Sequence, residues 1–285
     1  MWEGIVYING DFVPESEARI SVFDRGFLFA DGVYEVTSVL QGKLVDNAAH
    51  LARLHRSLEE ILLPCPLSDA AITRMQKTLV ARNALQEGMI YLQISRGPAP
   101  RDFAFPQPPI PSVVAFTQSR QLLKPPAVLQ GIKVVTLPDI RWRRRDIKTV
   151  GLLPASMAKQ AAMDMEADDA WMVEDGYVTE GTSNNAYIFD HSSRLITRPL
   201  SPDILPGITR KAILALAAEA GITIVERAFT VEEAYQAKEA FISSATTFVL
   251  PVVAIDGHPI GQGHPGPLVK RLRELYIQFA LKTLS

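Results

Sequence analysis

Residues 141–148 read RWRRRDIK and connect a predicted strand at residues 132–137 to a predicted helix at residues 154–165. The apolar patterns of the two flanking segments are those of a strand and of a helix. Further strands are predicted near residues 169–173 and 186–189. Because strands and helices alternate around this connection, we expect the C-terminal half of the chain to form an α/β domain.

The N-terminal half shows the same mixture of elements. Asn9-Gly10, the preferred pair for a tight hairpin, separates two short apolar runs. Asp46 is a good N-cap, and leucines recur after it at helical spacing. The remaining predictions in this half are a helix at residues 68–85 and strands at residues 89–94 and 112–116.

A Pro-rich segment divides the chain into two predicted domains. Residues 118–130, with Lys124-Pro125-Pro126, are typical of a linker. We predict an N-terminal α/β domain at residues 1–118, an interdomain linker at 119–130 and a C-terminal domain at 131–285. Later elements expected in the C-terminal domain are a helix at residues 209–220 ended by Gly221, strands at 222–225 and 240–242, and a C-terminal amphipathic helix.

Composition indicates a soluble globular protein. The 285 residues are 47% hydrophobic and 21% charged, which is enough to bury a substantial core. A net charge of −2 gives no overall attraction to nucleic acid or an anionic membrane, and a single cysteine fits a reducing compartment. The N-terminus lacks a signal-peptide pattern, and no run approaches the ~18–20 apolar residues of a membrane span. We therefore expect a cytoplasmic protein with neither a nucleic-acid nor a membrane partner.

The basic run at residues 141–148 has three interpretations. An aromatic residue within a basic run is typical of nucleic-acid binding, but such binding needs several phosphate contacts and this run is isolated in a slightly acidic chain. A solvated basic loop is the second interpretation. The third makes Lys148 a nucleophile, whose pKa would be lowered by burial and by Arg143, Arg144 and Arg145. The pattern alone leaves the last two open.

Three further clusters offer groups that bind phosphate or carboxylate. Residues 178–185 place Glu180 before a run of glycine, hydroxyl and amide residues. Residues 205–210 enter a predicted helix, whose N-terminus presents unpaired N–H groups. Residues 243–247 supply hydroxyl groups after a predicted strand. Each cluster could instead have a purely structural role. Residues 178–185 could form an ordinary turn, Thr209 could cap the helix that follows residues 205–210, and residues 243–247 could form a second turn.

The N-terminal half offers one candidate for carboxylate recognition. Arg101 lies in a loop framed by glycine and proline, which suits bidentate binding of a carboxylate. A surface ion pair is the alternative. Tyr34 is interpreted as a half-buried core residue, and His50 and Arg53, one helical turn apart, as a solvated helix face.

Several well-known catalytic motifs are missing. The sequence contains neither HExxH nor CxxC, so no metal site is predicted. It lacks G-x-S-x-G, its five histidines are scattered, and it has no Walker loop. Residues 261–266 match G-x-G-x-x-G but lie too near the C-terminus to open a βαβ unit, so they are expected to form a turn.

The order of the motifs resembles that of fold-type IV pyridoxal-phosphate enzymes, the class IV aminotransferases. The resemblance rests on Arg53, Lys148, Thr179-Glu180-Gly181, Pro206-Gly207-Ile208-Thr209-Arg210 and Ser244-Ala245-Thr246-Thr247. Within the family, residues 31–35 and 96–106 are most similar to D-amino-acid aminotransferase. The resemblance implies an α/β (α+β) fold of two lobes, an N-terminal α/β sandwich and a C-terminal pseudo-barrel. It also implies a pyridoxal 5'-phosphate cofactor and a homodimer.

The resemblance further implies roles for single residues. Lys148 would be the catalytic residue, binding the cofactor as a Schiff base and moving the substrate proton. Glu180 would hold the protonated pyridine nitrogen, and Arg53 would pair with the phosphate. The implied cofactor-binding set is completed by Ser183, Asn184, Leu205, Gly207, Ile208, Thr209, Ser244, Ala245 and Thr246. The implied substrate-binding residues are Tyr34, Arg101 and Phe103.

The implied activity is transfer of an amino group from a D-amino acid, such as D-alanine, to a 2-oxo acid, such as 2-oxoglutarate, by a ping-pong mechanism. Branched-chain L-amino-acid aminotransferase, (R)-amine transaminase and aminodeoxychorismate lyase of the same fold are alternatives. Two positions depart from the family pattern. Phe103 stands where D-amino-acid aminotransferases of the Bacillus type have a histidine, and Ala245 stands where a hydroxyl residue is common. The first departure leaves the choice between D- and L-amino acids open.

Overall fold

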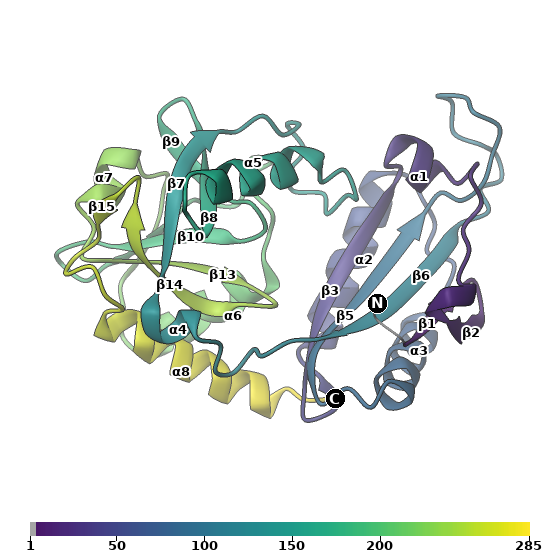
Figure 1. The fold of residues 1–285 in the computed structure, drawn as a ribbon, viewed down its shortest axis with the longest axis horizontal. Coiled ribbons are helices and arrows are strands. Elements are labelled where there is room, and N and C mark those ends of the chain that lie inside the picture. Colours follow the sequence, from purple (N-terminus) through teal and green to yellow (C-terminus); the bar gives the residue numbers. More distant parts are fainter. Residues whose placement is uncertain (1–3) are drawn as a thin grey trace. The chain divides into compact units, whose positions relative to one another are not determined.

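The computed structural model describes residues 4–285, which divide into two compact units (Figure 1). Unit 1 consists of the residues up to Gln121 together with Ile147–Gly151 and Ala280–Ser285, and unit 2 consists of Leu122–Asp146 and Leu152–Phe279. The predicted domains differ from these units at two segments, since the prediction assigns all of residues 131–285 to the C-terminal domain, whereas Ile147–Gly151 and Ala280–Ser285 belong to unit 1. The two later segments belong to unit 1 because Thr149 forms a β-bridge with Val33, and Leu284 one with Val45.

Unit 1 is built on a six-stranded sheet with the strand order β2-β1-β6-β5-β3-β4. The strands are β1 (Ile5–Ile8), β2 (Asp11–Pro14), β3 (Gly32–Leu40), β4 (Lys43–Leu44), β5 (Glu87–Ser95) and β6 (Ser112–Ser119). All neighbouring strands in it are antiparallel. The helices are η1 (Glu15–Glu17), α1 (Arg25–Phe29), α2 (Asn47–Glu60) and α3 (Asp69–Arg82).

The two faces of this sheet differ because successive strand residues point to opposite sides. On one face, residues such as Val33 and Leu92 are buried in a core with the apolar side chains of α2 and α3. On the other face lie the half-buried side chains of Tyr34, Tyr91 and Phe116. The helices therefore cover one side of the sheet and leave an aromatic surface on the other.

Unit 2 contains a nine-stranded sheet in which eight strands follow the order β12-β11-β10-β13-β14-β7-β8-β9, while β15 pairs with β14. The strands are β7 (Ile132–Pro138), β8 (Asp169–Glu174), β9 (Tyr177–Gly181), β10 (Asn185–Phe189), β11 (Leu195–Thr197), β12 (Ile224–Glu226), β13 (Glu239–Ser244), β14 (Phe248–Ile255) and β15 (His258–Pro259). The helices are α4 (Ala127–Gln130), α5 (Leu153–Asp164), α6 (Ile208–Glu219), α7 (Val231–Tyr235) and α8 (Pro267–Lys282). Across residues 4–285, no helix has the length and apolar character needed to cross a bilayer.

The sheet of unit 2 is strongly curled, since β7 and β14 run steeply against β10 and β13 (Figure 1). Strand β8 shows how its two faces are used. Ala170 and Met172 pack with Ala158 and Ala162 of α5, whereas Trp171 belongs to the larger cluster on the other side. The α/β fold of two lobes, a sandwich and a curled pseudo-barrel, is thus confirmed.

Two local predictions in unit 1 had different outcomes. The hairpin is confirmed, since Asn9 and Gly10 have φ values of 49° and 115° between paired strands β1 and β2. The helix after Asp46 is present, but the predicted capping is wrong. Asp46 is left-handed, with φ of 49°, and its side chain accepts no capping hydrogen bond. The hydrophobic face of α2, rather than an N-cap, therefore fixes this helix.

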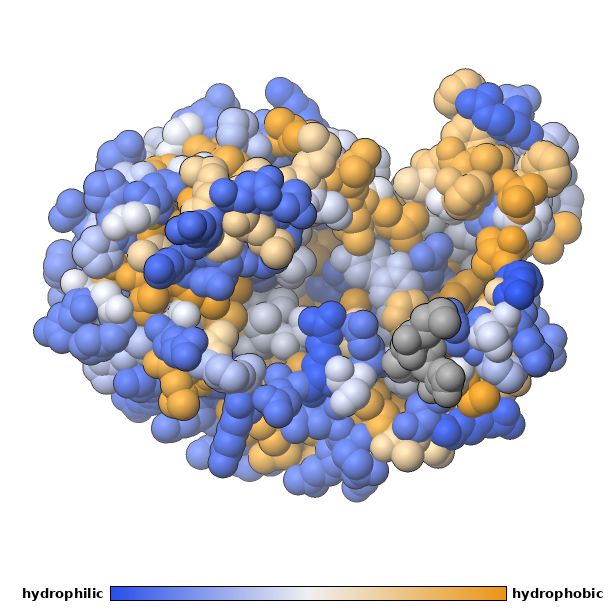
Figure 2. All heavy atoms as spheres, in the orientation of Figure 1, coloured by the Kyte–Doolittle hydropathy of each residue, from blue (hydrophilic) through white to orange (hydrophobic). Residues whose placement is uncertain are grey.

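Large apolar side chains are exposed over α1 and the loop at residues 96–111 (Figure 2). The residues that form this apolar patch, each more than half exposed, are Val22, Phe23, Phe27, Phe103 and Ile110. The two segments are joined by a hydrogen bond from the Ala99 N–H to the Phe23 carbonyl. A contiguous apolar surface of this kind is typical of an interaction site.

Candidate functional site

Lys148 lies beside the first residues of β3, within unit 1. Its carbonyl accepts a hydrogen bond from the Tyr34 N–H at 3.0 Å, and its own N–H donates to Ser57 Oγ at 3.4 Å. The half-buried side chain places Nζ 4.1 Å from the centroid of the Tyr34 ring. Among residues 4–285, no carboxylate pairs with this ammonium group. The amine is therefore held against an aromatic face and is not engaged in an ion pair.

The arginines that precede Lys148 were predicted to lower its pKa, but two of them are neutralised within unit 2. Arg144 Nε lies 3.0 Å from Asp146 Oδ1. The buried Arg145 places Nη1 2.7 Å from Glu174 Oε2. Burial of Arg145 also shows that a fully solvated basic loop was the wrong interpretation of the run. Two of the three arginines thus lie in ion pairs, and the net charge of each pair is zero.

An aromatic stack crosses three strands of unit 1 next to Lys148. The rings of Tyr34 and Tyr91 have centroids 5.4 Å apart, and those of Tyr91 and Phe116 lie 4.9 Å apart, both nearly parallel. Tyr91 donates its hydroxyl hydrogen to Gln93 Oε1 at 2.8 Å, and burial raises its pKa. Tyr34 is therefore a fixed wall beside the lysine, held by stacking as well as by the strand.

Arg53 is fixed by a buried ion pair in unit 1. Its Nε and Nη2 donate to the two carboxylate oxygens of Glu35 at 2.7 and 2.8 Å, while His50 Nδ1 lies 2.8 Å from Glu35 Oε2. His50 and Arg53 are both buried, so the predicted solvated helix face is wrong. Burial alone would raise the pKa of Glu35, but Arg53 and His50 outweigh it and lower the pKa to about 2.

Arg101 and Phe103 are exposed on a loop whose backbone is anchored by Arg25. Phe103 is 80% exposed, and its ring centroid lies 5.6 Å from that of Phe29. The Arg101 guanidinium lies 5.5 Å from the centroid of the same Phe29 ring. Arg25 donates to the carbonyls of Asp102, Phe103 and Ala104 at 2.5, 3.4 and 3.3 Å. The loop is thus held by its backbone, while Arg101 remains available to a ligand.

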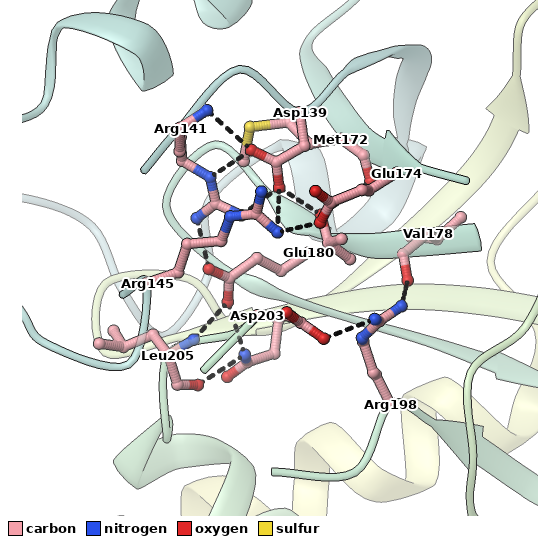
Figure 3. Close-up of polar contacts among 12 residues, drawn as sticks. Asp139, Arg141, Arg145, Met172, Glu174, Val178, Glu180, Arg198, Asp203 and Leu205 are labelled. Atoms are coloured by element: carbon pink, nitrogen blue, oxygen red, sulfur yellow. Dashed lines mark hydrogen bonds and ion pairs between the residues drawn. The ribbon is translucent and has the colours of Figure 1, made fainter. Parts of the chain in front are cut away.

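Glu180 is the centre of a buried polar network in unit 2 (Figure 3). It lies on β9, a strand that the sequence does not predict, and it is 4% exposed. Its Oε1 accepts a hydrogen bond from Arg141 Nη1 at 2.5 Å. Arg141 also binds both carboxylate oxygens of Asp139 through Nε and Nη2, at 3.0 and 2.7 Å. One guanidinium group therefore bridges two carboxylates.

The two carboxylates that share Arg141 have opposite pKa shifts. Burial raises the pKa of Glu180, and the contacts with Arg141 offset this only in part. Burial also opposes ionisation of Asp139, but the hydrogen bonds and charge of Arg141, with help from Thr179, lower its pKa. Glu180 is therefore the more basic carboxylate of the pair, which suits a group that must hold a proton on a bound nitrogen base.

The second oxygen of Glu180 is held by residues from two other segments. Its Oε2 accepts from Asn185 Nδ2 at 3.0 Å and from the Leu205 N–H at 3.1 Å. Asn185 also donates to the Leu205 carbonyl at 3.0 Å. The predicted Asn184 instead donates to Asp169 Oδ2 at 2.7 Å, and Ser183 is exposed in the turn. The buried amide that orients Glu180 is therefore that of Asn185.

Two phosphate-binding candidates remain in unit 2. Helix α6 begins at Ile208, and its N-cap, Gly207, provides no side-chain hydrogen bond. The first N–H groups of this helix are therefore not capped by a side chain. The turn between β13 and β14 gathers hydroxyls, with Ser244 Oγ 2.9 Å from Thr247 Oγ1 and 3.5 Å from Thr246 Oγ1. Ala245 lies half-buried in the same turn.

Residues 32–255 match the family model described as Amino-transferase class IV. The chain is 41% identical over 269 residues to a D-alanine aminotransferase of Bacillus licheniformis, covering 94% of both chains. It is 39% identical over 271 residues to one of Staphylococcus aureus, covering 94% of this chain and 95% of the other. The chain therefore belongs to the class IV aminotransferases, and it is an aminotransferase that depends on pyridoxal 5'-phosphate.

Two solved structures with the same fold are branched-chain amino acid aminotransferases. An Escherichia coli branched-chain amino acid aminotransferase superposes with a TM-score of 0.91 at 24% identity, over 98% of this chain and 95% of the other. A T.th. branched-chain amino acid aminotransferase, solved with pyridoxamine 5'-phosphate, gives a TM-score of 0.87 at 25% identity, over 100% and 99% of the two chains. The first likeness concerns the fold alone.

The residues of each unit fit the groups that pyridoxal phosphate presents. In unit 2, the uncapped start of α6 and the hydroxyl turn suit an anion, and the basic, buried Glu180 suits a pyridinium nitrogen. In unit 1, the Lys148 amine is free of an ion pair, as a group that must react with an aldehyde should be. The donor set of this chain therefore fits the cofactor.

Three supporting residues were missed from the sequence. Arg141 was treated only as part of a basic run, although its spacing of two from Asp139 could have indicated a shared ion pair. Asn185 is given no role in the sequence analysis. Because strand β9 is not predicted, the sequence does not indicate which side chains contact Glu180. Glu35 lies within residues 31–35 of the family resemblance, but nothing in the sequence indicates that it pairs with Arg53.

Proposed function

We propose that this aminotransferase takes its amino group from D-alanine or a related D-amino acid and passes it to a 2-oxo acid such as 2-oxoglutarate. The observation that carries the proposal is the 41% identity, over 94% of both chains, to a protein named D-alanine aminotransferase. Aminotransferase activity follows from the family. What we propose beyond it is that the amino donor is a D-amino acid. A ping-pong reaction fits one site that serves both substrates in turn.

Lys148 is the catalytic residue in this proposal. Its amine would hold the cofactor covalently and would move the Cα proton of the bound amino acid. The bound cofactor supplies an electron sink for the pair left on Cα. Support comes from unit 1, where the Lys148 Nζ lies over the Tyr34 ring with its backbone fixed on both sides. The amine can therefore act as nucleophile and then as base.

Glu180 holds the proton on the pyridine nitrogen. Its raised pKa makes it a good partner for a nitrogen base, because the proton is then shared instead of being surrendered to solvent. Arg141 and Asn185 orient the carboxylate through separate oxygens. Leu205, whose N–H donates to the same carboxylate, would pack against the cofactor ring.

The phosphate is bound by backbone and hydroxyl groups of unit 2 together with Arg53. The contributing residues are Gly207, Ile208 and Thr209 at the start of α6, and Ser244, Ala245 and Thr246 in the turn, where Ala245 offers only its backbone N–H. Ser183 and Asn184 complete the proposed set of cofactor-binding residues. Glu35 keeps Arg53 in one orientation through two hydrogen bonds, which supports its assignment as a preorganised phosphate ligand.

Arg101 and Tyr34 receive the substrate carboxylate, with Phe103 beside it. The guanidinium of Arg101 is exposed and has no carboxylate partner among residues 4–285, which suits it for a bidentate contact. Phe103 offers no hydrogen-bond donor, so the substrate carboxylate depends on fewer donors than in relatives with histidine at this position. The preference between D- and L-amino acids is consequently the part of the proposal that most needs a direct test.

A half-reaction screen tests the donor assignment. The holoenzyme is mixed separately with D-alanine, L-alanine, D- and L-leucine and an (R)-amine, and the loss of the lysine-bound cofactor absorbance is followed. The proposal predicts reaction with D-alanine at least ten times faster than with its L-isomer. If L-leucine reacts and D-alanine does not, the protein is a branched-chain aminotransferase. If only the amine reacts, it is an (R)-amine transaminase. Pyruvate release from aminodeoxychorismate, with no amino acceptor present, would identify the lyase.

We also propose that the enzyme acts as a homodimer in the cytoplasm. The apolar patch of unit 1 supports association, because five large side chains would otherwise remain in water. Replacing Phe27, which is 74% exposed, with Asp should shift the mass measured by light scattering from that of two chains toward that of one. An unchanged mass would remove this patch as the interface.

A further inference from the structure

Arg273 is buried on α8, in the interior of unit 2, and has no carboxylate partner among the described residues. Instead, its guanidinium donates to four backbone carbonyls. Nη1 lies 2.8 Å from the Thr247 oxygen and 2.7 Å from the Val249 oxygen. Nη2 lies 2.6 Å from the Leu122 oxygen and 3.0 Å from the Leu123 oxygen. A buried arginine is usually paired with an acid, so an unbalanced charge here calls for an explanation.

Two of these carbonyls, those of Thr247 and Val249, lie at the end of the Ser244–Thr247 turn, which carries the clustered hydroxyl groups. Between Thr247 and Val249 lies Phe248, whose φ of 58° is unusual for a bulky residue. The Phe248 ring also lies 5.8 Å from the Arg273 guanidinium. Arg273 therefore holds both peptide groups around a strained residue and fixes the turn that carries Ser244 and Thr246.

A second α8 side chain, one turn further along, touches the other phosphate-binding candidate. The Tyr276 hydroxyl lies 3.5 Å from Thr209 Oγ1 in the first turn of α6, and its ring lies 5.1 Å from that of Phe248. Both elements proposed to bind phosphate thus rest on the same face of α8. Arg273 supplies the charged group of that face.

The charge of Arg273 persists at neutral pH. Burial lowers its pKa to about 10, which still leaves the guanidinium protonated under physiological conditions. Carbonyl dipoles stabilise this cation only in part, and a charge in a low-dielectric interior acts on neighbouring charges more strongly than one in water. An anion bound by the adjacent Ser244–Thr247 turn would balance the remaining positive charge of Arg273.

We propose that Arg273 is a positioning residue for the cofactor phosphate: it fixes the Ser244–Thr247 turn and adds a buried positive charge behind it. This inference rests on the proposed function, specifically on the assignment of that turn to phosphate. It adds a residue that makes no direct contact with the phosphate and lies 26 residues beyond Thr247 in sequence. Its effect should be confined to the phosphate end of the cofactor.

The test compares two aldehydes that differ only in the phosphate group. Apoenzymes of wild type, Arg273→Gln, Arg273→Lys and Arg271→Gln are titrated with pyridoxal 5'-phosphate and with pyridoxal. Arg271 is an exposed residue of the same helix, so its substitution removes the same charge from a solvated position. The ratio of the two dissociation constants isolates phosphate recognition from reaction of the lysine with the aldehyde.

We expect Arg273→Gln to reduce the preference for pyridoxal phosphate over pyridoxal by about tenfold or more, with pyridoxal affinity unchanged. Arg273→Lys, which retains the charge, should lose less than about threefold, and Arg271→Gln should match wild type. Equal ratios in Arg273→Gln and Arg271→Gln would overturn the inference, as would an equal loss in the glutamine and lysine variants. If the glutamine variant does not fold, an equal loss of affinity for pyridoxal phosphate and for pyridoxal in the lysine variant overturns the inference.

The same titration separates this inference from the proposed function. A wild-type protein that binds pyridoxal phosphate no better than pyridoxal would refute the phosphate assignment, and the role of Arg273 would fall with it. A wild type with a strong phosphate preference, shared by Arg273→Gln, would leave the phosphate assignment intact and refute only the role of Arg273.

Discussion

The buried Glu35 makes the stability of the protein depend on pH in a way that one substitution can isolate. Glu35 is 1% exposed and binds Arg53 through both carboxylate oxygens. Replacing it with Gln keeps the shape but leaves the Arg53 charge without its counter-ion. Breaking a buried pair in this way typically costs about 3–5 kcal/mol of unfolding free energy near neutral pH.

The pKa of Glu35 gives an independent estimate with a defined pH window. Arg53 and His50 depress the pKa from its ordinary 4.5 to about 2, which corresponds to roughly 3 kcal/mol of stabilisation. Because the folded-state pKa is the lower one, this stabilisation is present above pH 4.5 and is lost as the pH falls toward 2. About 2 kcal/mol should already be lost at pH 3.

Urea unfolding of wild type and Glu35→Gln, followed by tryptophan fluorescence between pH 7 and pH 3, measures the difference directly. Other carboxylates titrate in both proteins, so the difference between the two free energies of unfolding reports Glu35. We expect a difference of about 3 kcal/mol at pH 7 that shrinks to about 1 kcal/mol at pH 3. A difference that stays constant across this range would show that Glu35 is not held ionised by Arg53.

Three further substitutions give distinct readouts. Phe103→His adds a side-chain hydrogen-bond donor to the proposed carboxylate site, so KM for D-alanine should fall about fivefold; an unchanged KM would contradict a carboxylate site there. Gly207→Ala brings a Cβ against Asn185 Oδ1, and the displaced amide should weaken pyridoxal-phosphate affinity about tenfold in an apoenzyme titration, whereas wild-type affinity would rule out the contact. Arg141→Gln removes the cation that partly offsets the raised pKa of Glu180, so the acid limb of the kcat/KM profile should move to higher pH; a limb that stays or moves down would refute the linkage.

Sequence patterns predicted the elements that depend on local chemistry. The Asn9-Gly10 turn suits positive φ, and the leucines of α2 repeat at helical spacing, so both elements could be located. The predicted helix that begins near Thr209 is present as Ile208–Glu219, since its apolar periodicity is also local. Such features need no knowledge of distant residues.

What the sequence could not predict depends on pairing between distant segments. The strand β9, which carries Glu180, is not predicted because it is held by its ladder with β8, which no local pattern reveals. The burial of Arg53 follows from Glu35 on a neighbouring strand, 18 residues away. Lys148 was placed in the C-terminal domain, whereas its segment joins unit 1 through the backbone of Tyr34. Long-range hydrogen bonds decide each of these cases.

The identity of the reacting lysine tests the central claim most directly. The holoenzyme is treated with borohydride, which makes the bond between cofactor and lysine permanent, and is then digested and analysed by peptide mass spectrometry. We expect one phosphopyridoxyl group on Lys148, and no label after reduction of Lys148→Ala. A label on another lysine, or none on the wild-type protein, would contradict the proposed catalytic site.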